Sequence, residues 1–283
     1  RTVVDGLDLA IPRGGVYGFL GPNGSGKSTT MKMLLGLLHP SAGQVFLLGE
    51  DPWGEARARL MPRIGSMIEH PPGYGHLTGA ENMRLLARLL NLETTRIDRA
   101  LELVRLTDHR DRLQRTYSLG MKQRLGIAMA LAREPELLIL DEPTNGLDPA
   151  GIEEIRELMI HLASGGVTVM ISSHLLDEID RMADILGVLS QGRLVFQGSR
   201  KELFERSIPD LIVVTPQANA AANLVRGCRL ERNGIRVQGC GQEDAARLIV
   251  RLVQEGIPIH EVRRLQQSLE EVFMDLTGGT EAL

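Results

Sequence analysis

The stretch from Gly21 to Thr29 has the residue types and spacing of a site that binds a polyphosphate. It follows an apolar run and precedes apolar residues that recur at helical spacing. Its glycines allow backbone N–H groups to approach phosphates closely at the positive end of a helix. A glycine-rich turn that only caps a helix is the alternative, but it requires neither Gly-Lys-Ser nor a preceding strand. The expected phosphate contacts are Gly21, Pro22, Asn23, Gly24, Ser25, Gly26, Lys27, Ser28 and Thr29.

Four side chains have the chemistry needed to bind and hydrolyse a nucleoside triphosphate. Lys27 would reach the terminal phosphates, and the Ser28 hydroxyl would bind Mg²⁺. Asp141 follows the apolar run 137–140, so we expect it at the carboxyl end of a strand, where it can hold Mg²⁺ through water. Glu142 can then polarise the attacking water. The alternative is that both carboxylates are helix caps or ion-pair partners.

His174 and Ser118 stand at the ends of other predicted elements. His174 closes an apolar strand over residues 167–171, which places it where the sheet edge should meet the γ-phosphate. A lone histidine is more often structural, but here it accompanies a phosphate loop and an acidic pair. Ser118 and Gly120 precede a predicted helix whose N-terminus offers a second anion site. In isolation Ser118 would be read as an N-cap.

These residues require an α/β fold with a buried sheet. Apolar runs predict strands at residues 16–20, 44–48, 64–68, 137–140 and 167–171. Residues 3–11 alternate loosely and suggest a further edge strand. Between the parts of this sheet we expect a helical insertion over about residues 78–132, because Thr78 and Glu81 have capping-box spacing before an apolar helical face.

Composition excludes several classes of protein. None of the apolar runs in the 283 residues is long enough to cross a bilayer, so any membrane role needs a partner. The formal net charge of −4 and the 3% of aromatic residues argue against a nucleic-acid partner. Cys228 and Cys240 are the only cysteines, which fits free thiols in a reducing compartment. The chain begins with Arg1 rather than methionine, so we expect its natural start to be missing.

Taken in this order, the motifs resemble those of the ATP-binding cassette (ABC) family of transport ATPases. The resemblance covers residues 1–207, and it implies a P-loop nucleotide-binding cassette that binds ATP with Mg²⁺ and hydrolyses it. The matching segments are the Walker A loop (21–28), the signature loop (118–122), the Walker B strand (137–141), the catalytic carboxylate (Glu142), the D-loop (145–148, including Asp148) and the switch histidine (His174).

The resemblance also implies partners. Each ATP would be clamped in a head-to-tail dimer between the Walker A loop of one copy and Ser118 and Gly120 of the other, with Asp148 beside it. An integral-membrane permease would hold the dimer at the cytoplasmic face of the membrane. The adenine-stacking aromatic of the family would lie before Arg1, so Val3 and Val4 are the nearest candidates for contacting the base.

Two positions depart from the common family pattern. The signature loop reads Ser-Leu-Gly-Met-Lys where Ser-Gly-Gly-Gln is usual, although Ser118 and Gly120 still match. Glu69 stands where the family has the glutamine of its Q-loop. Because hard cations favour carboxylate oxygens, we hypothesise that Glu69 contacts the metal or its bound water. The alternative is an ordinary solvated loop carboxylate.

Short strings around residues 64–69 and 77–82 resemble the bacitracin- and lantibiotic-type cassettes, which export peptide antibiotics or confer immunity to them. A non-transport ABC ATPase of the ribosomal or chromosomal kind is the alternative. The former usually carries two cassettes in one chain and the latter long heptads between its Walker motifs, and this sequence has neither. A non-catalytic nucleotide-binding module is a further alternative, against which Glu142 and His174 argue.

Residues 208–283 have a different pattern and predict a small accessory domain. Their elements follow the order β-α-β-β-α-β, which is typical of a ferredoxin-like α/β unit. Asn233-Gly234 between two predicted strands is a strong hairpin signal. We find no catalytic constellation here, and a regulatory or docking role is the most that the resemblance to export cassettes implies.

Overall fold

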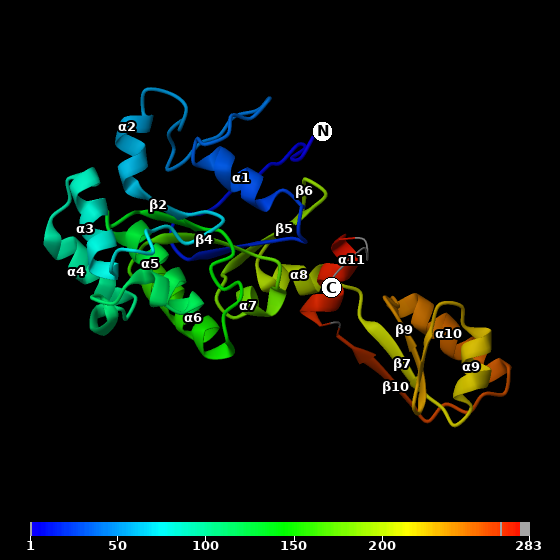
Figure 1. The fold of residues 1–283 in the computed structure, drawn as a ribbon. Coiled ribbons are helices and arrows are strands. Elements are labelled where there is room, and N and C mark those ends of the chain that lie inside the picture. The colour runs from blue at the N-terminus through cyan, green and yellow to red at the C-terminus, as the bar shows by residue number, and fades with distance from the viewer. Residues whose placement is uncertain (1, 267, 278–283) are drawn as a thin grey trace. The chain divides into compact units, whose positions relative to one another are not determined.

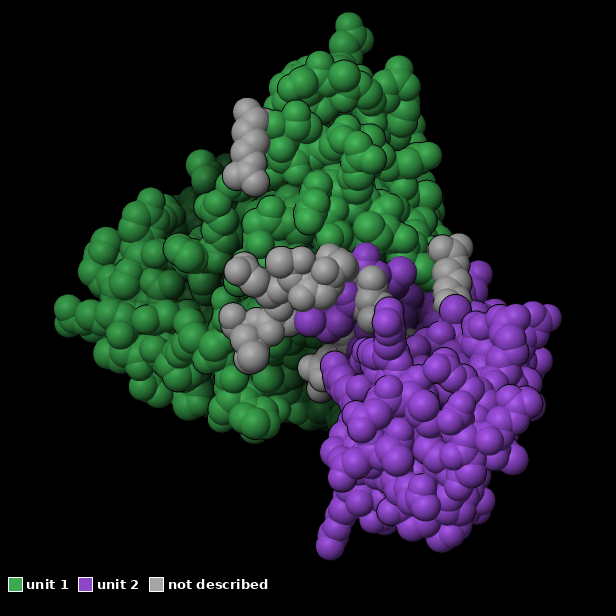
Figure 2. Space-filling view, turned by 90° about the vertical axis from the view of Figure 1, so that its right-hand side faces the viewer, with its two compact units in different colours: residues 1–199, 281–283 green, residues 200–280 purple. Residues whose placement is uncertain are grey.

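The computed structural model describes residues 2–266 and 268–277, which form two compact units (Figure 2). The units divide between Ser199 and Arg200, slightly before the boundary after residue 207 that the sequence suggested. The difference is helix α8 (Arg200–Arg206), which packs against α11 (Leu269–Thr277) within the second unit.

The first unit is built on a six-stranded sheet in the order β2-β3-β4-β1-β5-β6 (Figure 1). Neighbouring strands from β2 to β5 run parallel, and β6 returns antiparallel to β5. β1 and β3 are buried along their whole length, as expected for apolar runs in a parallel sheet covered on both faces. The strands are β1 (Val16–Leu20), β2 (Ile64–Met67), β3 (Leu137–Leu140), β4 (Thr168–Ser173), β5 (Ile185–Ser190) and β6 (Arg193–Gly198).

The carboxyl ends of β1, β3 and β4 lie side by side at one edge of this sheet. Leu20 at the end of β1 pairs with Ser173 at the end of β4, and Leu140 at the end of β3 pairs with Ile171. Open parallel sheets bind ligands outside such an edge. The phosphate loop, the acidic pair and the histidine therefore leave the sheet at neighbouring points, as the sequence predicted.

The predicted helical insertion is present as α3, α4 and α5. Thr78 caps α3 through the expected capping box: its hydroxyl accepts a hydrogen bond from the Glu81 amide, and the Glu81 carboxylate accepts one from the Thr78 amide. The helices of the first unit are α1 (Lys27–Leu34), α2 (Arg57–Leu60), α3 (Gly79–Leu90), α4 (Thr94–Leu103), α5 (Leu119–Leu131), α6 (Pro149–Ser164) and α7 (Leu176–Asp180), with 3₁₀ turns η1 (Met61–Arg63), η2 (Thr107–His109) and η3 (Gln114–Thr116).

The strands expected at residues 3–11 and 44–48 were wrong. Residues 3–11 form no strand, and in the second segment only an isolated bridge joins Leu47 to Glu50. Leu7, Leu9 and Ile11 instead pack their side chains against the core of the sheet. A segment that packs one face on the core shows the same alternation of apolar and polar residues as a strand, but it needs no backbone hydrogen bonds to a neighbouring strand. The sequence pattern alone therefore could not distinguish such a segment from a strand.

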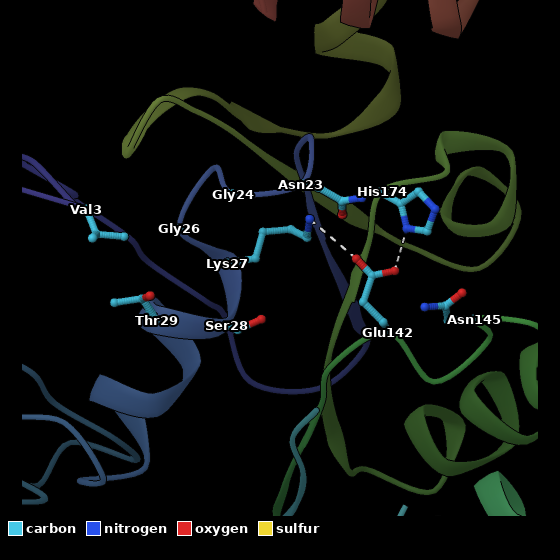
Figure 3. A pocket seen from close by; sticks show the side chains of 10 residues that line it. All are labelled: Val3, Asn23, Gly24, Gly26, Lys27, Ser28, Thr29, Glu142, Asn145 and His174. Atoms are coloured by element: carbon cyan, nitrogen blue, oxygen red, sulfur yellow. Dashed lines mark hydrogen bonds and ion pairs between the residues drawn. The ribbon is translucent and has the colours of Figure 1, made fainter. Parts of the chain in front are cut away.

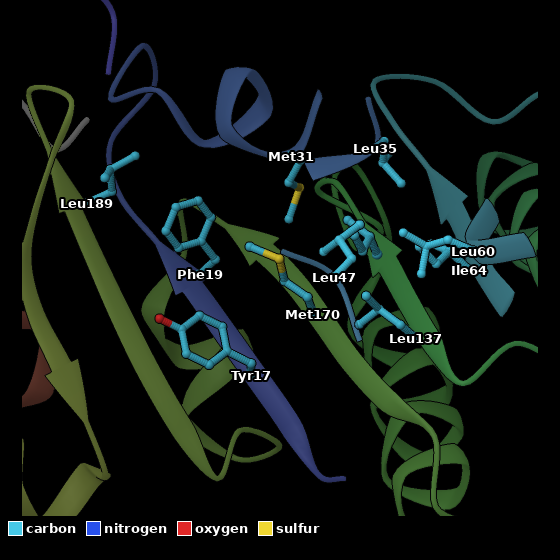
Figure 4. Close-up of a cluster of buried hydrophobic side chains, with 11 residues drawn as sticks. Tyr17, Phe19, Met31, Leu35, Leu47, Leu60, Ile64, Leu137, Met170 and Leu189 are labelled. Atoms are coloured by element: carbon cyan, nitrogen blue, oxygen red, sulfur yellow. The ribbon is translucent and has the colours of Figure 1, made fainter. Parts of the chain in front are cut away.

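The hydrophobic core of the first unit includes residues of β1, β4 and α1 (Figure 4). Tyr17 and Phe19 of β1 are buried there, which confirms their predicted place in the core, and they share the cluster with Met31 of α1 and Met170 of β4. Burial raises the pKa of Tyr17 above its usual range. The protonated hydroxyl donates a hydrogen bond to Gln197 Oε1 at 3.0 Å, which satisfies its polar atom.

The second unit contains a four-stranded antiparallel sheet in the order β10-β7-β9-β8. This order and the β-α-β-β-α-β succession confirm the ferredoxin-like prediction. The hairpin forms where expected, but its two turn residues are Arg232 and Asn233 because Gly234 already begins β9. The remaining elements are β7 (Asp210–Val214), α9 (Ala218–Leu224), β8 (Arg229–Glu231), β9 (Gly234–Val237), α10 (Gln242–Gln254) and β10 (Glu261–Leu265).

Candidate active site

A cavity of about 380 Å³ opens at the carboxyl edge of the first sheet (Figure 3). It brings together the phosphate loop after β1, the acidic residue after β3 and the histidine after β4, which come from distant parts of the sequence. Its lining residues are Val3, Asn23, Gly24, Gly26, Lys27, Ser28, Thr29, Glu142, Asn145 and His174. Val3, the expected neighbour of a base, lies on the side of the cavity away from His174 (Figure 3).

The phosphate loop joins β1 to α1 through a backbone conformation that requires glycine. Gly26 has φ +110°, which side chains of L-residues rarely adopt, and an added Cβ would lie 3.2 Å from the Val3 carbonyl oxygen. Helix α1 begins at the next residue, so its first N–H groups face the cavity. The Ser25 hydroxyl oxygen is buried and has no hydrogen-bond partner in the described part of the chain.

Lys27 is only 6% exposed, and its ammonium is held by several oxygens. Nζ donates to the Gly21 carbonyl at 2.6 Å and lies 3.3 Å from Glu142 Oε1. A buried cation is costly unless it is paired. The Glu142 carboxylate, which is itself 19% exposed, therefore compensates this charge in the resting site.

The Glu142 carboxylate contacts both Lys27 and His174 in the cavity. Its second carboxylate oxygen, Oε2, lies 2.6 Å from His174 Nδ1, while Oε1 faces Lys27 (Figure 3). The backbone of Glu142 has φ +50°, an uncommon conformation for a residue other than glycine. Such strain persists only when the surroundings fix it.

Ser172, which the sequence analysis did not single out, fixes part of the acidic pair. It is fully buried in β4, where its hydroxyl donates to Asp141 Oδ1 at 2.6 Å and accepts from the Glu142 amide at 2.9 Å. Asp141, at 4% exposed, thus keeps its second oxygen for another ligand. The Ser28 hydroxyl and the Asp141 carboxylate are oxygen donors of the kind that a hard cation such as Mg²⁺ prefers, but of the two only Ser28 lines the cavity.

Protein side chains alone do not make a full metal shell here. No cluster of three or more His, Cys, Asp or Glu side chains suited to a metal occurs among residues 2–266 and 268–277. Mg²⁺ in phosphoryl-transfer enzymes also takes oxygens from the phosphates and from water. The residues therefore fit a Mg²⁺ that arrives with its nucleotide.

Ser118 and Gly120 of the signature loop and Asp148 of the D-loop line a different cavity, whereas Asn145 of the D-loop lines the first. Ser118, Gly120 and Asp148 surround a hollow of about 390 Å³ that shares no lining residue with the first cavity. Ser118 and Asp148 also cap their helices by accepting hydrogen bonds from the Met121 and Gly151 amides. One chain therefore does not bring the predicted phosphate loop and signature loop together.

Glu69 lies elsewhere again. Its carboxylate pairs with Lys32 Nζ at 2.5 Å and is 59% exposed, and it does not line the first cavity. The Lys32 ammonium, by hydrogen bonding and charge, lowers the pKa of Glu69 below its usual value. Glu69 is therefore ionised at neutral pH and has a partner other than a metal in this structure.

Comparison with known proteins agrees with the family that the motifs suggested. The ABC transporter family profile matches residues 4–145, which include the phosphate loop and the acidic pair. The chain belongs to the ABC transporter family. The bacitracin transport ATP-binding protein BcrA of Bacillus licheniformis is 40% identical over 286 residues, which span 98% of this chain and 92% of BcrA. The lantibiotic transport ATP-binding protein SrtF of Streptococcus pyogenes is 43% identical over 214 residues, which span 74% of this chain and 92% of SrtF.

Solved ABC structures show the same fold. The structure of cbiO1 from Clostridium perfringens, part of the ABC transporter complex cbiONQ, has a TM-score of 0.66 and 31% identity. The match covers 72% of this chain and 84% of cbiO1. The resemblance inferred from the motifs is thus confirmed for the family and the cassette fold. The ABC chain binds and hydrolyses ATP, and none of its described helices is long and apolar enough to cross a membrane.

Proposed function

We propose that this ABC ATPase powers a membrane permease that exports a peptide antibiotic or a similar amphipathic compound. The observation that carries the proposal is the convergence of Lys27, Glu142 and His174 on one cavity at the carboxyl edge of the sheet. The names of the relatives supply the class of cargo, since they include bacitracin, lantibiotic and daunorubicin proteins. These relatives favour a transport role over a ribosomal or chromosomal one.

In the proposed reaction, the phosphate loop holds the triphosphate with its backbone N–H groups. Lys27 turns from Glu142 toward the β- and γ-phosphates, which releases Glu142 Oε1 to accept a proton from the attacking water. His174 contacts Glu142 in the structure, and it would meet the γ-phosphate once ATP binds. Ser28 and Asp141 would hold Mg²⁺, which would supply positive charge to neutralise the phosphates.

The proposed site is completed by a second copy of the chain. Ser118, Gly120 and Asp148 border a cavity separate from that of Lys27 and Glu142. In a dimer, each chain would therefore supply one half of each of two composite sites. A head-to-tail dimer would place these residues of one copy against the ATP of the other, at the cytoplasmic face of the membrane. ATP-driven uptake of bacitracin into inside-out vesicles tests the transport function.

Glu69 is proposed to leave Lys32 and to contact Mg²⁺ or its bound water when ATP binds. Glu69→Gln should then keep appreciable ATPase activity but raise the Mg²⁺ concentration that gives the half-maximal rate. Transport should fall more than hydrolysis, because the loop after Glu69 contains exposed residues, Pro72 and Gly73, that could contact a permease. Phosphate release across a Mg²⁺ titration provides the measurement.

Lys32→Gln is the matched variant for this prediction. It removes the competing ion pair and keeps the Glu69 carboxylate, so the half-maximal Mg²⁺ concentration should fall rather than rise. If both variants show the Mg²⁺ dependence of the unaltered chain, Glu69 is only the surface partner of Lys32. Surface pairs of this kind contribute little to stability, so neither variant should disturb the fold.

A further inference from the structure

A single carboxylate joins the two chain segments that carry Glu142 and His174. Glu178, in α7, accepts a hydrogen bond from the Thr144 hydroxyl at 2.5 Å and another from the Ser173 hydroxyl at 3.0 Å, both at Oε2. The two donor residues are almost completely buried, at 1% and 0% exposed. Hydrogen bonds to a charged acceptor are about twice as strong as neutral ones, so this junction is stiff.

Each donor stands next to a residue of the proposed reaction. Thr144 lies in the loop that follows Glu142, and that loop is closed by a backbone hydrogen bond of 3.1 Å from the Asn145 amide to the Glu142 carbonyl. Ser173 directly precedes His174, and its hydroxyl also accepts from the Leu175 amide at 2.9 Å, which spans the histidine. Glu178 therefore ties the end of β3 to the end of β4.

We infer that Glu178 is a positioning residue that sets the approach of Glu142 to His174. This inference rests on the proposed function, because it takes Glu142 and His174 as the reacting pair. Their 2.6 Å contact joins residues that leave different strands, and Glu142 holds an uncommon backbone conformation. Ser172 fixes the Glu142 amide from β4, and Glu178 fixes the next part of the loop from α7.

Glu178 acts through its two donors rather than on the nucleotide. The described residues that line the cavity include Glu142, Asn145 and His174 but not Glu178. Its loss should therefore lower kcat and leave the KM for ATP nearly unchanged, since the phosphate loop has its own supports. Small misplacements of reacting groups can cost about 10²-fold in rate, so we expect Glu178→Ala to lower kcat by roughly 10–100-fold.

Glu178→Gln distinguishes positioning from the loss of a partly buried charge. The amide oxygen of glutamine can accept both hydrogen bonds at nearly the same place, so this variant should recover kcat to within about fivefold of the unaltered chain. Thr144→Val and Ser173→Ala remove the donors one at a time. Because residues of one network are not additive, Thr144→Val should add little to Glu178→Ala. Glu157 of α6 is exposed and pairs with Arg105, and it supplies the control Glu157→Ala, which should leave both constants unchanged.

Steady-state phosphate release tests the inference, and the thermal midpoint of unfolding is measured on the same samples to show that each variant is folded. If the kcat of Glu178→Ala is within twofold of that of the unaltered chain, the inference is wrong. It is also wrong if Glu178→Gln does not recover kcat and its affinity for ATP falls by a similar factor. If Glu178→Ala does not fold, Thr144→Val and Ser173→Ala replace it, and unchanged kcat in both overturns the inference. Glu142→Gln is assayed alongside. Near-normal turnover in Glu142→Gln would contradict the proposed function. If Glu142→Gln loses its turnover but Glu178→Ala keeps a normal kcat, only the inference about Glu178 is contradicted.

Discussion

Replacing Glu142 by glutamine should lower the rate of ATP hydrolysis by roughly 10²–10⁴-fold while ATP still binds. Glutamine keeps the size of the side chain and a hydrogen-bonding oxygen but cannot accept the proton of the attacking water. The Lys27 ammonium, which lies 3.3 Å from Glu142 Oε1, loses a charged partner that the phosphates replace when ATP binds. Phosphate release and calorimetric ATP affinity measure the two effects separately. With ATP, the variant should also persist as a dimer on gel filtration.

Glu136→Gln is the matched control, because this acid precedes β3 and pairs with Arg63 outside the cavity. It should leave turnover near its normal value. Turnover near that of the unaltered chain in Glu142→Gln would remove Glu142 from the reaction and with it the proposed role of this cavity.

Chains that carry Lys27→Ala and chains that carry Ser118→Arg should each lose most ATPase activity, and a mixture of the two should regain part of it. Lys27→Ala weakens ATP binding, because the ammonium no longer neutralises the β- and γ-phosphates. Ser118→Arg blocks the separate cavity that would receive the ATP of the partner. In a head-to-tail dimer of one chain of each kind, one composite site is intact. Random pairing then restores about a quarter of the full turnover, since half of the dimers are mixed and each has one working site.

The matched control for this experiment mixes Lys27→Ala with Glu142→Gln. These two residues line the same cavity, so a mixed dimer has one defect in each composite site and should recover nothing. Equal recovery in both mixtures, or none in either, would argue against a site shared between two copies.

The arrangement of the site could be predicted because it follows from sheet topology. Parallel strands place their carboxyl ends at one edge, so Lys27, Glu142 and His174 were expected to converge although they lie far apart in the sequence, and the structure brings them into contact. Ser172 and Glu178 were missed because nothing in their sequence positions marks them as functional. A serine in a strand and a glutamate in a short helix are common. The pairing of β3 with β4 brings Ser172 to the acidic pair, and the fold brings Glu178 to Thr144 in the loop that follows it.

Other expectations depended on contacts that a sequence does not specify. The alternation of Leu7, Leu9 and Ile11 suggested a strand, but these side chains pack on the core without a ladder. Glu69 was read from its position in the motif, which gave no sign that Lys32 would reach its carboxylate. Its role toward Mg²⁺ stays a prediction, as do the roles of the signature and D-loop residues in a dimer.

ATP-driven transport across a membrane tests the central claim most directly. Inside-out vesicles are prepared from cells that express this chain together with its flanking reading frames, and bacitracin uptake is followed after Mg²⁺ and ATP are added. We expect uptake that depends on ATP and is abolished by Glu142→Gln, with the variant chain present in the vesicles at the normal amount. Equal uptake with the unaltered chain and with Glu142→Gln, while the unaltered chain hydrolyses ATP, would contradict the account.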